Sequence, residues 1–515
     1  MKNRKGTLIN MSAALITFAV QMFISFWLSP FVVARLGEEA YGFINLANNF
    51  VSYTGLLAVA INSMACRYIS VKYNSGEIEE AKRYFSSVFI VNCLLYSLIL
   101  IIAVIFVGQI ERILSVTQEL VYQVKVTFFL SFVNMGASLI GTVYTAATFT
   151  TNKMHYASLV QMASNILKSI LVFILFTILP AKIYYLSIAT LAASVVTLIG
   201  NYRITRTLLE DFSVKISLFD ISKIIILVKS GVWVLLSNIS NLLLNGFDLL
   251  LSNWFISSAI MGRLSIAKQI PFALSGALGI FSNIFSSSLT KVYVLDGKND
   301  LGKEAESQLK LLTVFFTVPF AGIIAIGPQF LKLWLANTNY SEAVLNQIYI
   351  LMLLVLIDII ISTYMYSIHS VFIALNKVKS YSILLFAASL ISMLTTVYLL
   401  NYTNLGVYAI AGTSTIVLGV THALIVPGIA ALLLGKKISP FWIREIKSWL
   451  LLCLIVLIFK GISWTMRFDS WTIFCVNVLI LATIGYFISF FGVFNNTERH
   501  AMRDLIMKKR KSNEF

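Results

Sequence analysis

Apolar residues occur along this chain in long uninterrupted runs. Leu94 to Val107 and Ile166 to Leu179 are two examples. Runs of about 20 residues are long enough to cross a bilayer as helices, and a helix satisfies its own backbone polar groups in lipid. The runs lack the apolar–polar alternation of a membrane barrel strand. The pattern therefore predicts an all-α polytopic membrane protein.

The apolar runs predict about 14 transmembrane helices. The expected spans are residues 8–33, 41–66, 85–108, 121–147, 157–179, 183–202, 229–255, 260–288, 310–327, 345–372, 380–400, 405–434, 445–463 and 471–494. The first run is longer than the apolar part of a cleavable signal peptide, so we expect it to be retained as a span. An even number of spans places both termini on the same side of the membrane.

The distribution of basic residues indicates which side that is. Of the 39 lysines and arginines, 29 fall in the loops and tail on the side of the termini and 7 on the opposite side. Basic residues collect in cytoplasmic loops, so both termini are expected in the cytoplasm. This asymmetry also accounts for the net charge of +17 without a nucleic-acid partner.

An internal repeat is visible at an offset of 220 residues. Residues 41–43 (Tyr-Gly-Phe) align with residues 261–263 (Met-Gly-Arg), and upstream polar positions also correspond. Six predicted spans separate the copies, so the repeat is parallel, as in several transporters. We therefore expect two pseudo-symmetric six-helix lobes with two further helices after them. The predicted parts are an N-lobe at 1–222, a C-lobe at 223–440, the two C-terminal helices at 441–494 and a basic cytoplasmic tail at 495–515.

Polar side chains recur on single faces of three predicted spans, at intervals of three or four residues. A polar face turned to lipid is costly, so these faces are expected to point either to neighbouring helices through hydrogen bonds or to a water-filled cavity. The candidate cavity residues from these faces are Gln21, Ser25, Gln161, Asn165, Asn241 and Asn245.

Charged residues inside predicted spans are a sharper signal, because a charge near mid-bilayer costs at least about 2.5–3.5 kcal/mol. Lys168 lies near the centre of the fifth span, with no acidic residue one turn away. Asp248 and Lys268 lie ten residues on either side of a turn near residue 258, so they form either an ion pair or part of a substrate site. Arg263 lies nearer the membrane surface and is a further cavity candidate.

Asp358, near the centre of the tenth span, and His369 are candidates for coupling transport to an ion or proton. The chain shows no nucleotide-binding, zinc or nucleophile motif, and its four cysteines lack metal-ligand spacing. Charged residues make up 12% of the sequence and the mean hydropathy is +0.87, which leaves no room for a soluble catalytic domain. We therefore expect no catalytic residue, cofactor or metal, and a protein that is not an enzyme.

The segment at residues 34–43, Ala-Arg-Leu-Gly-Glu-Glu-Ala-Tyr-Gly-Phe, resembles the first outer turn of polysaccharide flippases. These are the Wzx-like O-antigen and capsule exporters of the multidrug/oligosaccharidyl-lipid/polysaccharide (MOP) superfamily, which often carry Leu-Gly-x-x-x-Tyr-Gly there. Residues 247–248 and 260–262 are similar to their seventh and eighth spans. Arg263 stands where an aromatic residue is common in the family.

The resemblance implies a flippase of the bacterial cytoplasmic membrane that works by alternating access. Its cargo would be an oligosaccharide repeat unit linked to undecaprenyl pyrophosphate, moved from the cytoplasmic to the outer leaflet for surface polysaccharide synthesis. Membrane lipids and the polysaccharide polymerase machinery are the implied partners. Lys168 would then supply positive charge for the pyrophosphate, and the two C-terminal helices a groove for the lipid tail.

Two alternatives remain. One is a multidrug or cation exporter of the related branch, which usually has twelve spans and an acidic site in its first lobe; the expected first-lobe spans contain Lys168 and neither Asp nor Glu. The other is a membrane glycan polymerase or ligase. Such enzymes usually have a large outer loop, whereas the longest one expected here, residues 328–344, is short.

Overall fold

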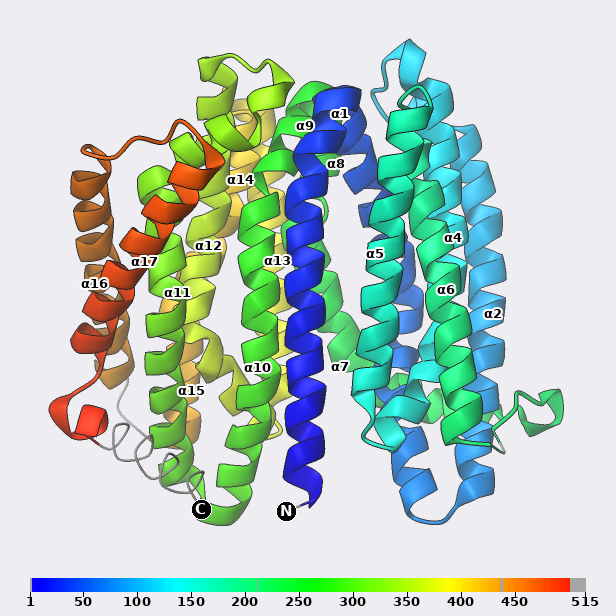
Figure 1. Ribbon diagram of the computed structural model, residues 1–515. Helices are drawn as coiled ribbons and strands as arrows, with labels where there is room; N and C mark the ends of the chain where they lie inside the picture. Colours follow the sequence, from blue (N-terminus) through cyan, green and yellow to red (C-terminus); the bar gives the residue numbers. More distant parts are fainter. Residues whose placement is uncertain (1, 211, 436–438, 501–515) are drawn as a thin grey trace. The chain divides into compact units, whose positions relative to one another are not determined.

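Figure 1 shows the protein as a computed structural model, in which residues 2–210, 212–435 and 439–500 are described. Within these ranges the chain forms helices and no strand, as predicted. The helices are α1 (Lys2–Asn74), α2 (Ile78–Gly108), α3 (Ile110–Ile113), α4 (Val121–Thr150), α5 (Met154–Ile178), α6 (Tyr184–Leu208), α7 (Ile221–Asn245), α8 (Asp248–Phe255), α9 (Ser258–Ala267), α10 (Gln269–Asp296), α11 (Lys298–Trp334), α12 (Glu342–Ala374), α13 (Val378–Tyr402), α14 (Val407–Val420), a π-helical turn (Thr421–Ile425), α15 (Val426–Leu434), α16 (Ser439–Ser463) and α17 (Trp471–Val493).

Helix α1 contains two predicted spans, not one. A straight helix of its 73 residues would be about 110 Å long, far more than the roughly 30 Å of a bilayer core. Gly37 interrupts it with φ 84° and ψ 170°, a conformation that a residue without a Cβ adopts readily. The first arm, residues 2–36, rises from the N-terminus and the second, residues 38–74, returns to the same side (Figure 1).

The number of spans agrees with the expectation once both arms are counted. Twelve helices of the described residues are long and apolar enough to cross a membrane, or up to 13 if the bent pair α9–α10 is one span. Those figures count α1 once, although Gly37 divides it. The fold is therefore that of an all-α polytopic membrane protein.

The predicted seventh and eighth spans, residues 229–255 and 260–288, are both interrupted in the structure. One interruption lies at Gly246–Phe247, between α7 and α8, and the other at Lys268, between α9 and α10, where the axis bends by 42°. Interrupted helices at membrane depth are tolerated where other groups satisfy the freed backbone. These interruptions position the polar residues described below.

Hydrogen bonds at corresponding places support the internal repeat. Thr17 Oγ1 donates to the Ser158 carbonyl at 3.1 Å, and the residue 220 positions after Thr17, Ser237, lies 2.8 Å from the Ser382 hydroxyl. A second bond recurs at an offset of 210 residues. Thr205 donates to the carbonyl of residue 144 at 2.8 Å, and Thr415 to that of residue 354 at 2.7 Å.

By its internal contacts the chain divides into two compact units. The first unit comprises residues 1–269 and 382–414, and the second comprises residues 270–381 and 415–515. One apolar core of the first unit contains Ile69, Phe85 and Leu227. In the second, α16 and α17 pack on α11 around Phe320 and Phe459. The lobe boundaries at 222 and 440 stay predictions.

Candidate functional site

A small polar cavity lies inside the first unit, which we call the lysine cavity. It has a volume of about 150 Å³, and its walls come from both arms of α1, from α4, α5 and α6, and from Gln269. Its polar lining residues are Ser25, Ser29, Tyr41, Asn45, Asn48, Ser131, Asn134, Lys168, Ser187, Thr190 and Gln269. Of the described residues that line it, Lys168 alone is charged.

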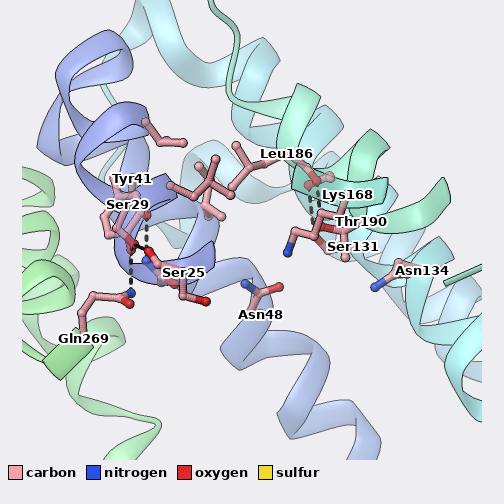
Figure 2. Close-up of a pocket in the computed structure, with 15 residues that line it drawn as sticks. Ser25, Ser29, Tyr41, Asn48, Ser131, Asn134, Lys168, Leu186, Thr190 and Gln269 are labelled. Carbon is pink, nitrogen blue, oxygen red and sulfur yellow. Dashed lines mark hydrogen bonds between the residues drawn. The ribbon is translucent and has the colours of Figure 1, made fainter. Parts of the chain in front are cut away.

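Lys168 is the predicted mid-membrane cation, and the structure places it in this wall. Figure 2 shows its side chain beside Ser131 and Thr190, across from Asn48 and Ser25. None of the ion pairs among the described residues includes Lys168, so neither Asp358 nor another acid in those ranges neutralises it. The cavity also contains Asn134, whose buried Oδ1 has no hydrogen-bond partner. The cavity thus presents one positive charge and a set of uncharged hydrogen-bonding groups.

The wall opposite Lys168 is held by a short chain of hydrogen bonds. The hydroxyl of Tyr41 donates to Ser29 Oγ at 3.0 Å and accepts from Gln269 Nε2 at 2.5 Å (Figure 2). Ser29 in turn donates to the Ser25 carbonyl at 2.8 Å. Tyr41 belongs to the Leu-Gly-x-x-x-Tyr-Gly segment, so that segment forms one wall of the cavity through its tyrosine.

A second cavity of the first unit, which we call the amide cavity, is larger, at about 450 Å³. The second arm of α1 and helix α7 line it with Asn49, Ser52, Gly55, Leu56, Val59, Asn238, Asn241, Leu242, Asn245 and Gly246. Two of the predicted candidates, Asn241 and Asn245, therefore face a cavity together. The sequence interpretation missed Asn48 and Asn49; their signal was a pair of adjacent amides within an apolar span.

The remaining stripe residues lie elsewhere. Gln21 is exposed on the first arm of α1 and does not line either cavity. Gln161 Nε2 donates to Asn165 Oδ1 at 3.2 Å, so these two amides of α5 bind each other, and neither lines the lysine cavity. Of the candidates on α1 and α5, only Ser25 and Lys168 share this cavity.

The break between α7 and α8 is stabilised by side chains from other segments. The Gly246 carbonyl accepts from Asn49 Nδ2 at 2.8 Å and from the Tyr53 hydroxyl at 2.5 Å. The Asn245 carbonyl accepts from Lys268 Nζ at 2.7 Å. These donors replace the backbone partners that the helix loses where it ends, which is what an interrupted helix needs at this depth.

Lys268 also forms an ion pair with Asp248, the first residue of α8, whose carboxylate accepts a hydrogen bond from the Leu249 amide at 2.8 Å. The two side chains are only 6% and 13% exposed. Each charge thus neutralises the other, and a role of the pair in substrate binding stays a prediction. Neither lines the lysine cavity or the amide cavity.

Arg263 is likewise engaged in an ion pair, with Glu38. Its Nε donates to both carboxylate oxygens at 3.1 Å, and its Nη2 lies 3.0 Å from one of them. Glu38, which directly follows the Gly37 turn, was missed because acids beside an outer turn are usually solvated. Arg263 lines neither described cavity, so it is not placed as a cavity cation.

The two copies of the repeat touch each other at this turn. A Cβ added to Gly42 would lie 2.9 Å from the Cα of Gly262, and one added to Gly262 would lie 2.1 Å from the backbone oxygen of Glu38. Asn45 Nδ2 donates to Ser265 Oγ at 2.6 Å. Both pairs, 42 with 262 and 45 with 265, are related by the 220-residue offset.

The coupling candidates belong to a polar cluster in the second unit. The Oδ1 atom of Asp358 is buried and has no hydrogen-bond partner among the described residues, and Ser362 lies one turn further along α12. The Ser362 hydroxyl lies 3.3 Å from His422 Nδ1, and the Tyr381 hydroxyl 3.4 Å from its Nε2. The ring of His369 is centred 4.2 Å from that of Tyr381.

His422 lies in the π-helical turn, residues 421–425. Such turns are rare and frequent at functional sites. The sequence interpretation had named Asp358 and His369 for coupling; the structure adds the residues that lie between them.

The sequence pattern that describes the family "Polysaccharide biosynthesis protein" matches residues 4–287. The chain belongs to this family. The resemblance drawn from residues 34–43 is thereby confirmed at the family level. A curated relative, the uncharacterized membrane protein EpsK of Bacillus subtilis (strain 168), is 26% identical over 433 residues, covering 84% of this chain and 85% of the relative.

Solved transporters share the fold of this polysaccharide biosynthesis protein. An inward-facing multidrug resistance transporter of the MATE family, in the MOP superfamily, matches with a TM-score of 0.68 at 14% identity, covering 83% of this chain and 98% of that one. The lipid II flippase MurJ, in an inward closed conformation, matches with a TM-score of 0.66 at 15% identity, covering 97% and 100%. Because 97% coverage omits only about 15 residues, the second match includes most of α16 and α17.

Proposed function

We propose that this protein is a flippase that moves an oligosaccharide linked to undecaprenyl pyrophosphate from the cytoplasmic to the outer leaflet, for surface polysaccharide synthesis. The observation that carries the proposal is the lysine cavity: Lys168 lines a polar space inside the first unit, without an ion-pair partner among the described residues. Membership of the polysaccharide biosynthesis family and the fold shared with a lipid II flippase support this assignment.

The chemistry of the cargo explains why a cation belongs there. The pyrophosphate head group is anionic, and moving an isolated charge into an apolar medium is very costly. A protein path must replace the lost water with polar groups and positive charge, as Lys168 and the surrounding hydroxyls and amides do. Outward movement of an anion across an inside-negative membrane also gains about 2.3 kcal/mol per charge per 100 mV.

The charge pattern of the first unit argues against the multidrug or cation exporter. A cation site needs an acid that can take up the cation. Asp248 and Glu38, which lie close to the cavities in sequence, are neutralised by Lys268 and Arg263. Glu39 lies beside Glu38, accepts hydrogen bonds from Thr117 and lines neither cavity. The extent of the match to the lipid II flippase, which includes the C-terminal helices, points the same way. We assign the protein to transport rather than to glycan polymerisation or ligation.

The cargo site is tested by export of surface glycan in Lys168 variants at matched protein level. Lys168→Ala and Lys168→Gln should lose export and accumulate lipid-linked repeat units inside the cell, whereas Lys168→Arg should keep part of the activity because it keeps the charge. Lys153→Ala, an exposed lysine just before the same helix α5, is the matched control and should export normally. Normal export by Lys168→Ala would refute the proposal.

The orientation that we propose is the one expected from the basic residues: a multi-pass protein of the bacterial cytoplasmic membrane with both termini in the cytoplasm. Reporter fusions after Lys182 and Ser341 should report the outer side, and a fusion after Lys215 the cytoplasm. Alternating access between the predicted lobes, 1–222 and 223–440, and contact with the polysaccharide polymerase machinery complete the proposal. A tail that reports the outer side would contradict the span count.

We also propose that the cluster around Asp358 couples transport to protons. Asp358 lies one helical turn from Ser362, whose hydroxyl lies 3.3 Å from His422 Nδ1. The Tyr381 hydroxyl lies 3.4 Å from Nε2 of the same ring, and the tilted ring of His369 is centred 4.2 Å from that of Tyr381. Asp358 and His369 are separated by eleven residues, or about 16 Å along α12. The cluster could therefore carry a proton over about half of the bilayer core.

A further inference from the structure

We infer that the linker between α6 and α7, residues 209–220, anchors the first unit to the surface of the bilayer. Its short turn, residues 216–218, lies in the head-group region of the leaflet that is cytoplasmic in the proposed orientation. Ile216 and Phe219 insert among the lipids, and Lys215 meets the phosphate of an anionic phospholipid. The inference concerns the surrounding lipid rather than the cargo, so it goes beyond the proposed function and does not depend on it.

The inner side of the linker is packed against the protein. Phe212 is buried in the apolar core of the first unit described above. The turn is fixed to α2 at both ends, because the amide of Lys215 donates to Ser86 Oγ at 3.3 Å and the amide of Asp220 donates to Ser87 Oγ at 2.9 Å. Both serines are fully buried. The linker therefore has a fixed outer side, and the residues exposed there are set by the fold.

The outer side of the linker is apolar. Ile216 is 85% exposed and Phe219 is 40% exposed, and Ile221, the first residue of α7, is 56% exposed. Exposed apolar surface of this kind is unfavourable in water. A segment with an apolar side and charged neighbours gains free energy when its apolar side is buried at the boundary between head groups and acyl chains. A bilayer surface is therefore the partner that this side of the linker fits.

The hydrogen bonds to α2 set the depth of the turn in the membrane. From Ser87 to Gly108, where α2 ends, the helix is about 32 Å long. The apolar core of a bilayer is about 30 Å thick. With Gly108 at the outer boundary of this core, Ser87 and the turn bonded to it lie at the opposite boundary. In Figure 1 the linker accordingly projects sideways from the end of α6, whereas the turn between α1 and α2 extends farther along the helices.

The two flanking helices carry lipid-facing surfaces that meet the linker. On α6 the exposed Ile199 is followed on the same face by Tyr202 and Arg206, and Arg206 Nε donates to the Tyr202 hydroxyl at 3.3 Å. Tyrosine and arginine at the end of an apolar face are typical of the lipid–water interface. On α7 the exposed apolar face begins at Ile221 and continues one turn later with Ile225. The linker thus joins the end of one lipid-facing surface to the start of the next.

The charges near the turn favour an anionic lipid. Lys215 is exposed in the linker and Arg206 on the last turns of α6, and none of the ion pairs between described residues includes either of them. Of the described acids in the linker, Asp220 lies 4.0 Å from Arg83 Nη1, and Glu210 is exposed. Basic side chains beside an apolar interfacial segment attract anionic head groups. Phosphatidylglycerol should therefore bind here better than phosphatidylcholine.

The test is fluorescence quenching of the full-length protein in nanodiscs, with a dansyl amino acid in place of Ser217, an exposed residue between the two apolar side chains. Lipids with a spin label high on the acyl chain should quench it at least about twofold more than a dansyl amino acid in place of Ser75, which is exposed in the turn between α1 and α2. Ile216→Asp should lower the quenching at position 217 to the level at position 75. Phosphatidylglycerol should raise the quenching at position 217 above that in phosphatidylcholine, and Lys215→Gln should remove this increase. Lys153→Gln, at an exposed lysine just before α5, is the matched control and should keep it.

Three results would overturn the inference. Equal lipid quenching at positions 217 and 75 would place the turn in water. Protection of position 217 from iodide without quenching by lipid would show that protein, either this chain or a second copy, covers the turn. Unchanged quenching in Ile216→Asp would exclude this side chain as the anchor, because an exposed side chain can be replaced without loss of the fold, which equal melting temperatures in detergent would verify. Equal quenching in the two lipids would refute the part assigned to Lys215.

Discussion

The buried ion pair between Lys268 and Asp248 allows a quantitative prediction about stability. Lys268 joins three segments, because it pairs with Asp248 at the start of α8, donates to the Asn245 carbonyl at the end of α7 and itself lies between α9 and α10. Removing either side chain leaves a charge in a site where the exposed fractions are 6% and 13%. Removing both side chains leaves no charge.

The expected magnitudes follow from these contacts. Breaking a buried pair by removing one partner costs about 3–5 kcal/mol, because the other charge stays buried without compensation. Asp248→Leu should fall in this range. Lys268→Met should cost about 1–3 kcal/mol more, because it also leaves the Asn245 carbonyl without its donor. The double variant buries no unpaired charge, so most of the charge penalty should disappear. Its remaining loss of stability should be about the cost of the unpaired Asn245 carbonyl.

The measurement is equilibrium unfolding of the purified full-length protein in detergent for both single variants and the double variant. A double-mutant cycle should give a coupling free energy of at least about 2 kcal/mol. Additive losses, with the double variant as unstable as the sum of the singles, would refute the reasoning. Glycan export at matched protein level gives a separate answer: a double variant that folds well and exports nothing would show that the pair acts on the cargo.

Three further predictions concern packing, coupling and a charge pair near the C-terminus. Gly262→Leu should lower both stability and export, because its side chain would collide with the backbone of Glu38. Gly279→Leu, whose side chain meets open space, should be tolerated, and melting curves of the two variants test the difference. Asp358→Asn should abolish the dependence of lipid transport on a pH gradient in proteoliposomes but leave downhill transport, and an unchanged dependence would exclude this residue from coupling. The hydrogen bond from Lys310 holds the pKa of Glu498 below its usual range. The contribution of this pair to stability is therefore complete above about pH 4.3 and disappears as the pH falls through the lowered pKa. Glu498→Gln should remove that pH dependence in unfolding measurements, with a loss below about 1 kcal/mol at neutral pH.

The spans could be predicted from the sequence because each helix is an apolar run that satisfies its own backbone. The break at Gly246 could not, because it depends on donors about 200 residues away in the chain, Asn49 and Tyr53. The Lys268–Asp248 pair was one of two predicted alternatives because both residues lie at equal distance from a turn.

The polar faces show what a helical period can and cannot reveal. Spacing at three and four residues placed Asn165 and Lys168 on one side of α5, but it gives no information on what each side chain meets. Asn165 binds its neighbour Gln161, and only Lys168 reaches the lysine cavity. Glu38 was overlooked because its partner, Arg263, is distant in sequence.

The contact between Gly42 and Gly262 bears on how the internal repeat could have evolved. Residues at equivalent positions of a repeat meet each other only where a local two-fold axis passes between the copies, as in an isologous homodimer, where a surface patch meets itself. The hydrogen bond from Asn45 to Ser265 obeys the same relation. A half-length ancestor that paired with itself through this patch would have used the same contacts, with gene duplication and fusion joining the two copies later.

Fusion removes a constraint that such a dimer would have had. In a homodimer every substitution appears twice, so a charge placed at the axis faces an identical charge. In the present chain Glu38 corresponds to Ser258, and Arg263 corresponds to Phe43. The Glu38–Arg263 ion pair therefore exists once, without a mirror image. A single chain that contains both copies of the repeat can carry such an unsymmetrical ion pair, whereas a homodimer cannot. The Gly37 turn and its counterpart near residue 257 can therefore change independently of each other.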